Sequence, residues 1–121
     1  MIDHLSITVS NYDESRRFYG SALSSIGYRL IMEHPISGAG FGADGKPSFW
    51  IRRGVVAKGT HVAFTAANRA AVDRFHSAAI SAGGADNGAP GLRPEYHPTY
   101  YGAFVLDPDG YNVEAVCHVP E

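Results

Sequence analysis

The chain has 121 residues, the length of one compact domain, and its 45% hydrophobic and 18% charged content excludes wholesale disorder. A net charge of -2 provides no basic surface for nucleic acid. No apolar run approaches the roughly 20 residues that span a bilayer, and Cys117 has no second cysteine to pair with, so we expect a cytoplasmic protein without nucleic acid or membrane as a partner.

An internal repeat organises the chain. The segment Asp3-His4-Leu5-Ser6-Ile7-Thr8-Val9 aligns with Thr60-His61-Val62-Ala63-Phe64-Thr65. The offset between His4 and His61 also aligns residues of the following segments: Phe18 with Phe75, Ala22 with Ala79, and Gly27 with Gly84. The order of these matches and their constant spacing predict two copies of one structural unit.

In the first copy, the alternating segment 4–9 predicts a strand with His4 on its polar face. A helix follows, with Asn11 or Asp13 as its N-cap and Gly27 at its end. Shorter strands separated by glycine and proline turns complete this copy. We expect them at roughly 28–33, 39–43 and 48–53.

The link to the second copy lies near Gly54 to Gly59. The second copy opens with a strand at His61, and Asn68 caps a helix that stops at the pair Gly83-Gly84. The stretch from Gly84 to Pro98 is rich in loop residues, and we expect one short strand there at most. The last strands are expected at 100–106 and 111–118.

The order of these elements indicates the fold class. Strands outnumber helices, and each helix connects strands of its own copy. We therefore predict one α+β domain over 1–121, with mostly antiparallel or mixed sheet. Its two modules are expected at about 1–57 and 58–121.

Two histidines and one carboxylate are candidate metal ligands. His4 and His61 occupy equivalent positions in the two copies, and Glu114 lies on the last predicted strand among apolar residues. A carboxylate in such a place needs solvent or a partner. Two imidazoles and a carboxylate suit a divalent Zn, Fe, Ni or Mn ion. The alternative is that both histidines are half-exposed strand residues and Glu114 faces solvent.

A family resemblance is carried by residues 3–9, the helical run Ser15-Arg16-Arg17-Phe18-Tyr19, residues 60–64 and the stretch from Gly102 to Glu114. Together these segments resemble the vicinal oxygen chelate superfamily, the glyoxalase/bleomycin resistance/dioxygenase group. The likeness covers nearly the whole chain. It implies two tandem βαβββ modules whose curled sheets form a cleft, with a metal held by the first and fourth strands of both modules. By that match, the ligand positions are His4, His61 and Glu114.

The fourth ligand position departs from the pattern of the family's lyases. Phe49 or Trp50 falls where those lyases carry a glutamate, which disfavours a lactoylglutathione lyase. The remaining ligand set is similar to that of the ring-cleaving dioxygenases. His97 precedes Glu114 at a spacing that resembles their signature, but Phe104 and Pro94 replace its tyrosine and glycine.

The loop from Arg93 to Tyr101 places a cation, a histidine and three tyrosines just before the final strands. It is interpreted either as a lid of the cleft or as a proline-stiffened loop whose tyrosines pack on the sheet edge. As a lid, it would supply substrate contacts through Arg93, Tyr96 and Tyr100, with Trp50 as an apolar wall. The candidate catalytic groups are Glu114, His97 and Tyr101.

The resemblance implies a metal-dependent enzyme, a lyase, isomerase or dioxygenase, that chelates neighbouring oxygens of a small-molecule substrate. It also implies a homodimer, with the metal held within one chain or across two. The alternative is a metal-free protein that binds antibiotics or similar small molecules, as the bleomycin-resistance proteins do. The tyrosine-rich loop and Trp50 suit this alternative, whereas the three retained ligand positions favour the enzyme.

Overall fold

The structure, a computed structural model, describes residues 2–121 and consists of two modules with one helix and four strands each. The first contains β1 (Leu5–Val9), α1 (Tyr12–Ser24), β2 (Arg29–His34), β3 (Gly38–Ala43) and β4 (Lys46–Arg53). The second contains β5 (His61–Thr65), α2 (Arg69–Ser81), β6 (Ala85–Leu92), β7 (Tyr101–Leu106) and β8 (Asn112–Cys117). Residues 54–60, which include the expected link at Gly54 to Gly59, lie between β4 and β5.

Each module forms one mixed, open sheet. The strand orders are β1-β4-β3-β2 and β5-β8-β7-β6, so equivalent strands take equivalent places. In both sheets the first and last strands of the module pair in parallel, while the other neighbours are antiparallel. These arrangements confirm the predicted α+β class and the two βαβββ modules.

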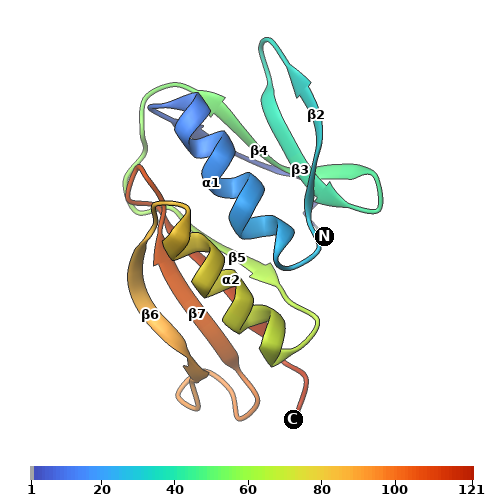
Figure 1. The fold of residues 1–121 in the computed structure, drawn as a ribbon, viewed down its shortest axis with the longest axis vertical. Helices are drawn as coiled ribbons and strands as arrows, with labels where there is room; N and C mark the ends of the chain where they lie inside the picture. The colour runs from blue at the N-terminus through green and yellow to red at the C-terminus, as the bar shows by residue number, and fades with distance from the viewer. Residues whose placement is uncertain (1) are drawn as a thin grey trace.

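The helices begin where the sequence predicts. The Asn11 side chain accepts a hydrogen bond from the Glu14 backbone N–H at 3.1 Å, and Asn68 accepts one from the Ala71 backbone N–H at 2.8 Å. Each bond satisfies a donor that the first helical turn leaves without a partner. The two helices lie side by side, each over its own sheet (Figure 1). No helix within residues 2–121 is long and apolar enough to span a membrane.

One core joins the two modules. In β1 the alternation turns Ile7 and Val9 inward, where both are buried. Aromatic side chains then cross from one module to the other, and the rings of Phe49 and Phe64 lie edge to face with centroids 5.1 Å apart. This contact belongs to one hydrophobic core that contains residues of both modules.

The turn after β7 fastens the second module to the first. The hydroxyl of Tyr19 on α1 donates to the buried Asp107 carboxyl at 2.5 Å. The hydroxyl of Tyr111 donates to the Thr8 carbonyl at 2.6 Å, and the Ser10 backbone N–H donates to Asp109 at 3.0 Å. Burial raises the pKa of the Asp107 carboxyl above its ordinary value, against hydrogen bonds that lower it.

Strand β6 is longer than the sequence suggested. Where one short strand at most was expected between Gly84 and Pro98, β6 spans eight residues and pairs with β7. The register shifts at Gly88, whose φ of 151° favours glycine. Since β6 is an edge strand with one paired side, Pro90 costs no hydrogen bond to a second neighbour, so a loop-like composition is tolerated.

Candidate functional site

The open face of the second sheet brings His61 and Glu114 together. Both side chains lie on the face opposite α2, His61 at the start of β5 and Glu114 in the adjacent β8. His61 Nε2 lies 3.0 Å from Glu114 Oε2. His61 Nδ1 lies 3.0 Å from the Asn112 carbonyl oxygen, which fixes the orientation of the ring.

Glu114 is a buried carboxyl, only 1% exposed. Its second oxygen, Oε1, accepts a hydrogen bond from the Tyr100 hydroxyl. Burial and this bond raise the pKa of Tyr100 well above its ordinary value, so the hydroxyl stays protonated and can donate. Gly102 makes room for the contact, because a Cβ there would lie 3.1 Å from both Glu114 Oε1 and Tyr100 Cε1.

The hydrogen atoms around His61 do not suffice for a neutral imidazole that faces an ionised carboxylate. The Asn112 carbonyl only accepts, so Nδ1 carries a hydrogen. Neutral imidazole has no second N–H, and an ionised Glu114 has none to give. The contact between His61 Nε2 and Glu114 Oε2 therefore needs a shared proton or a cation.

A divalent metal fits this pair. Two ligands bound about 2.1 Å from one ion are separated by roughly 3.0 to 3.4 Å in octahedral or tetrahedral arrangements. The 3.0 Å between His61 Nε2 and Glu114 Oε2 matches that separation. The Asn112 carbonyl holds the other ring nitrogen, as in most histidines that bind metals. His61 and Glu114 thus have the chemistry and spacing of two metal ligands.

His4 lies apart from this pair, in the first module. Its Nδ1 is 2.8 Å from Asp3 Oδ2, and Asp3 also forms an ion pair with Lys46. Across residues 2–121, no three histidine, cysteine, aspartate or glutamate side chains are grouped closely enough to hold one ion. The sequence left open whether His4 meets His61 and Glu114 within one chain or across two, and the first arrangement is not found.

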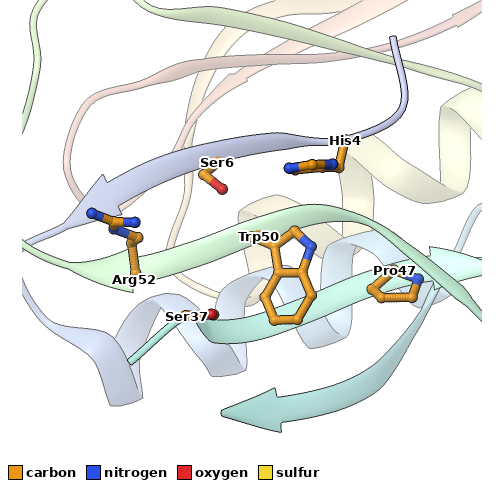
Figure 2. A pocket seen from close by; sticks show the side chains of 6 residues that line it. All are labelled: His4, Ser6, Ser37, Pro47, Trp50 and Arg52. Carbon is orange, nitrogen blue, oxygen red and sulfur yellow. The ribbon is translucent and has the colours of Figure 1, made fainter. Parts of the chain in front are cut away.

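His4 lies in a pocket on the open face of the first sheet (Figure 2). The pocket has a volume of about 400 Å³ and is built by β1, β4 and the turn before β3. Arg52 lies at one end, His4 and Pro47 lie at the other, and Trp50 lies between them. Its lining is His4, Ser6, Ser37, Pro47, Trp50 and Arg52.

The two aromatic residues expected at the fourth ligand position point to opposite faces. Phe49 is 2% exposed and belongs to the core, whereas Trp50 faces the pocket beside His4. The location of Trp50 suits its expected role as an apolar wall. Neither side chain can bind a metal, so β4 adds no ligand here.

The loop before β7 contacts the site through Tyr100. Tyr96 is 63% exposed and its ring lies 5.1 Å from that of Tyr100. His97 accepts a hydrogen bond from the Thr99 backbone N–H at 3.2 Å and makes no hydrogen bond to Glu114. The loop therefore brings Tyr100 into contact with the Glu114 carboxyl, whereas His97 forms its hydrogen bond within the loop.

Two more of the expected residues have contrasting places. Arg93 lies over the ring of Phe104, 5.5 Å from its centroid, and Phe104 stacks on His61 at 6.1 Å. The ring of Phe104 therefore separates Arg93 from the candidate ligand His61. Tyr101, expected as a catalytic group, points to the helix side, where its hydroxyl donates to Asp73 on α2 at 2.7 Å. The pleat of β7 thus separates it from Glu114.

Several residues of these two faces were missed by the sequence analysis. Ser6 and Arg52 each lie two positions from a candidate, His4 and Trp50, so strand alternation could have identified them. Ser37 precedes β3 in a turn, and Asn112 acts through its backbone carbonyl, so no sequence pattern marks either.

Comparisons with known proteins identify the family and agree with the fold. Residues 1–115 match the family model described as the Glyoxalase/Bleomycin resistance protein/Dioxygenase superfamily. Among solved structures, the fold is similar to a glyoxalase/bleomycin resistance protein from Albidiferax ferrireducens T118, with 24% identity, 98% of each chain covered and a TM-score of 0.82.

A glyoxalase/bleomycin resistance protein/dioxygenase family enzyme from Burkholderia phytofirmans PsJN is also similar, with 18% identity, 98% of each chain covered and a TM-score of 0.75. A glyoxalase-related enzyme from Fulvimarina pelagi follows, with 16% identity, 97% of this chain and 87% of the other covered, and a TM-score of 0.72. At these identities the likeness shows a shared fold. No curated protein matches the sequence.

Proposed function

The chain belongs to the Glyoxalase/Bleomycin resistance protein/Dioxygenase superfamily, and from this premise we propose that it is a metal-dependent enzyme acting on a small molecule with two neighbouring oxygens. His61 and Glu114 are the proposed ligands from one subunit. The supporting observation is their contact at 3.0 Å, in which an oxygen of a buried carboxyl faces Nε2 of an imidazole whose Nδ1 is held by the Asn112 carbonyl. The metal is a divalent Zn, Fe, Ni or Mn ion.

The third proposed ligand is His4 from a second copy of the chain. His4 and His61 occupy equivalent positions in the two modules. His4 directly precedes β1, and His61 is the first residue of β5. Both rings have Nδ1 against an oxygen, the Asp3 carboxylate for His4 and the Asn112 carbonyl for His61. The two open faces lie in different modules, so a homodimer that brings unlike modules together would join His4 to the other pair.

The chain's own residues prepare the site for substrate. Tyr100 holds the Glu114 carboxylate by one oxygen and directs the other toward His61. Phe104 stacks on His61 and restricts the ring. A divalent ion held there supplies Lewis-acid polarisation of the two substrate oxygens. The class of reaction, lyase, isomerase or dioxygenase, then depends on groups outside the metal ligands.

Metal content tests the proposal. Protein purified without a chelating tag is expected to hold about one divalent ion per chain, and His61→Ala and His4→Ala should each lose it. His76→Ala is the matched control, because His76 lies on α2 and pairs there with Asp86. Elemental analysis measures the ion, and equal metal in wild type and His61→Ala would refute the site.

Mixing two inactive variants tests the shared site. In a dimer of His4→Ala with His61→Ala, one site keeps both histidines and the other loses both. Refolding the mixture should therefore restore about a quarter of the wild-type metal. If the three ligands come from one chain, no mixture restores metal, and the proposal of a site across two chains fails.

A metal-free binding protein is the second candidate. The observation that favours it is the pocket at Trp50, whose lining comes from one module and needs no second copy to exist. The two functions differ in their response to a chelator. Ligand binding that survives complete metal removal, in a protein without metal-dependent turnover, would favour the binder.

A further inference from the structure

The pocket of the first module is basic and aromatic. Its two ionisable residues, His4 and Arg52, are both bases, and serine hydroxyls and the Trp50 ring make up much of the rest. Its volume of about 400 Å³ lies within the range of small-molecule sites. These properties point to a small anion with an apolar body.

Arg52 is available to bind that anion. Over residues 2–121, no carboxylate forms an ion pair with it. Its neighbour Arg53 differs, since it points to the other face and lies over the Tyr12 ring, 4.2 Å from the centroid. A guanidinium stays charged at every physiological pH and binds a carboxylate through two parallel hydrogen bonds.

Trp50 provides a stacking surface next to Arg52. Its ring lies over Gly40, where a Cβ would come within 2.9 Å of Trp50 Cη2 and of Pro47 Cβ. Glycine at this position therefore lets the indole settle against the sheet beside Pro47. The ring remains partly exposed to the pocket (Figure 2). An indole held in this way stacks well on another aromatic ring.

We propose that this pocket binds a monocyclic aromatic carboxylate, with its carboxylate on Arg52 and its ring on Trp50. The two residues are two positions apart on one strand, about 7 Å, which such a molecule spans. The ring edge opposite the carboxylate then faces the end of the pocket where His4 lies. The inference rests on the proposed function and names the substrate class for it.

Fluorescence of the chain's single tryptophan provides the test. Metal-free wild-type protein titrated with benzoate should show saturable quenching of Trp50. Benzamide has the ring without the charge, and acetate has the charge without the ring. Each should bind at least about tenfold more weakly than benzoate. Equal binding of benzamide or acetate, or no quenching by benzoate, overturns the proposal.

Neighbouring arginines give a matched pair of variants. Arg52→Met should weaken benzoate binding about tenfold or more, and Arg52→Lys by less, since lysine keeps the charge but loses the planar fork. Arg53→Met should bind benzoate as wild type does. An equal loss in Arg52→Met and Arg53→Met overturns the proposal.

His61→Ala separates this inference from the proposed metal site. It should lose metal but retain benzoate binding, because His61 belongs to the other module. Metal loss with intact benzoate binding in this variant supports both proposals. If wild type purified without a chelating tag binds benzoate but contains no metal, only the metal enzyme is overturned. If that protein contains metal but does not bind benzoate, only the aromatic acid is overturned.

Discussion

At the residue scale, the neighbouring residues Tyr100 and Tyr101 have different contacts because their side chains lie on opposite faces of the sheet. Tyr100 donates to the buried Glu114 carboxyl on the open face, and Tyr101 donates to Asp73 on the helix face. The two side chains have the same chemistry and opposite surroundings. Only the first can influence the orientation of the candidate ligand Glu114.

Replacing Tyr100 by phenylalanine should weaken metal binding by roughly tenfold or more, because Glu114 loses the donor that orients it. The free energy of unfolding should fall by about 1 to 3 kcal/mol, since one buried oxygen loses its partner. Tyr101→Phe is the control. It should leave metal affinity unchanged, and metal titration followed by chemical denaturation measures both effects. Equal metal affinity in Tyr100→Phe and wild type would contradict the positioning role.

Part of the site could be predicted from residues alone. The repeat predicted equivalent positions for His4 and His61. The apolar neighbours of Glu114 correctly indicated that its carboxyl needs a partner. The face of Tyr101 could not be predicted, because it depends on the register of β7 against β8, which pairs Phe104 with Glu114. The separation of His4 from the pair depends on packing between modules, which no local pattern encodes.

At the element scale, glycines mark where a helix or strand approaches its neighbour. Gly84 joins α2 to β6, and a Cβ there would lie 2.5 Å from Val105 Cγ1 and 2.8 Å from Phe18 Cε2. Gly20 lies within α1, and a Cβ there would meet nothing within 4 Å. The repeat aligned Gly84 with Gly27 and suggested a helix stop, but its packing against Phe18 in the other module was not visible in the sequence.

These two glycines should respond oppositely to alanine. Gly84→Ala should lower the free energy of unfolding by about 1 to 3 kcal/mol through overpacking. Gly20→Ala should raise it by about 0.5 to 1 kcal/mol, because alanine favours the helix and has room. Thermal or urea denaturation measures both changes. A stabilised Gly84→Ala protein would show that the side chains of Phe18 and Val105 move easily to make room for the added methyl group.

The element boundaries show where sequence patterns are strong. Helix starts were predictable because Asn11 and Asn68 each satisfy a backbone donor of the first turn. Strand β6 was underestimated because its glycines and Pro90 are typical of loops. Pairing with β7 along one edge overrides that local preference.

At the scale of the whole molecule, the Asp107 turn couples the two modules through Tyr19. Burial raises the pKa of Asp107, so the folded state binds a proton more tightly than the unfolded state does. Stability contributed by this carboxyl is therefore present below its unfolded pKa of about 3.8 and declines as the pH rises through its folded value.

Comparison of wild type with Asp107→Asn isolates this effect. The asparagine oxygen can still accept from the backbone N–H groups of Asp109 and Tyr111. The stability of wild type relative to the variant should fall as the pH is raised from 3 to about 6. Urea denaturation at a series of pH values measures the difference, and a difference that increases with pH would contradict the burial argument.

The groups that orient the two histidine rings differ in charge, so the orientations of His4 and His61 should respond differently to ionic strength. His61 is aimed by a main-chain carbonyl, which dissolved salt does not screen appreciably. His4 is aimed by Asp3, an exposed carboxylate that also attracts Lys46, and such surface charges are screened over about 10 Å in 0.1 M salt. Added electrolyte should therefore weaken the contact that orients His4, while the backbone carbonyl continues to orient His61.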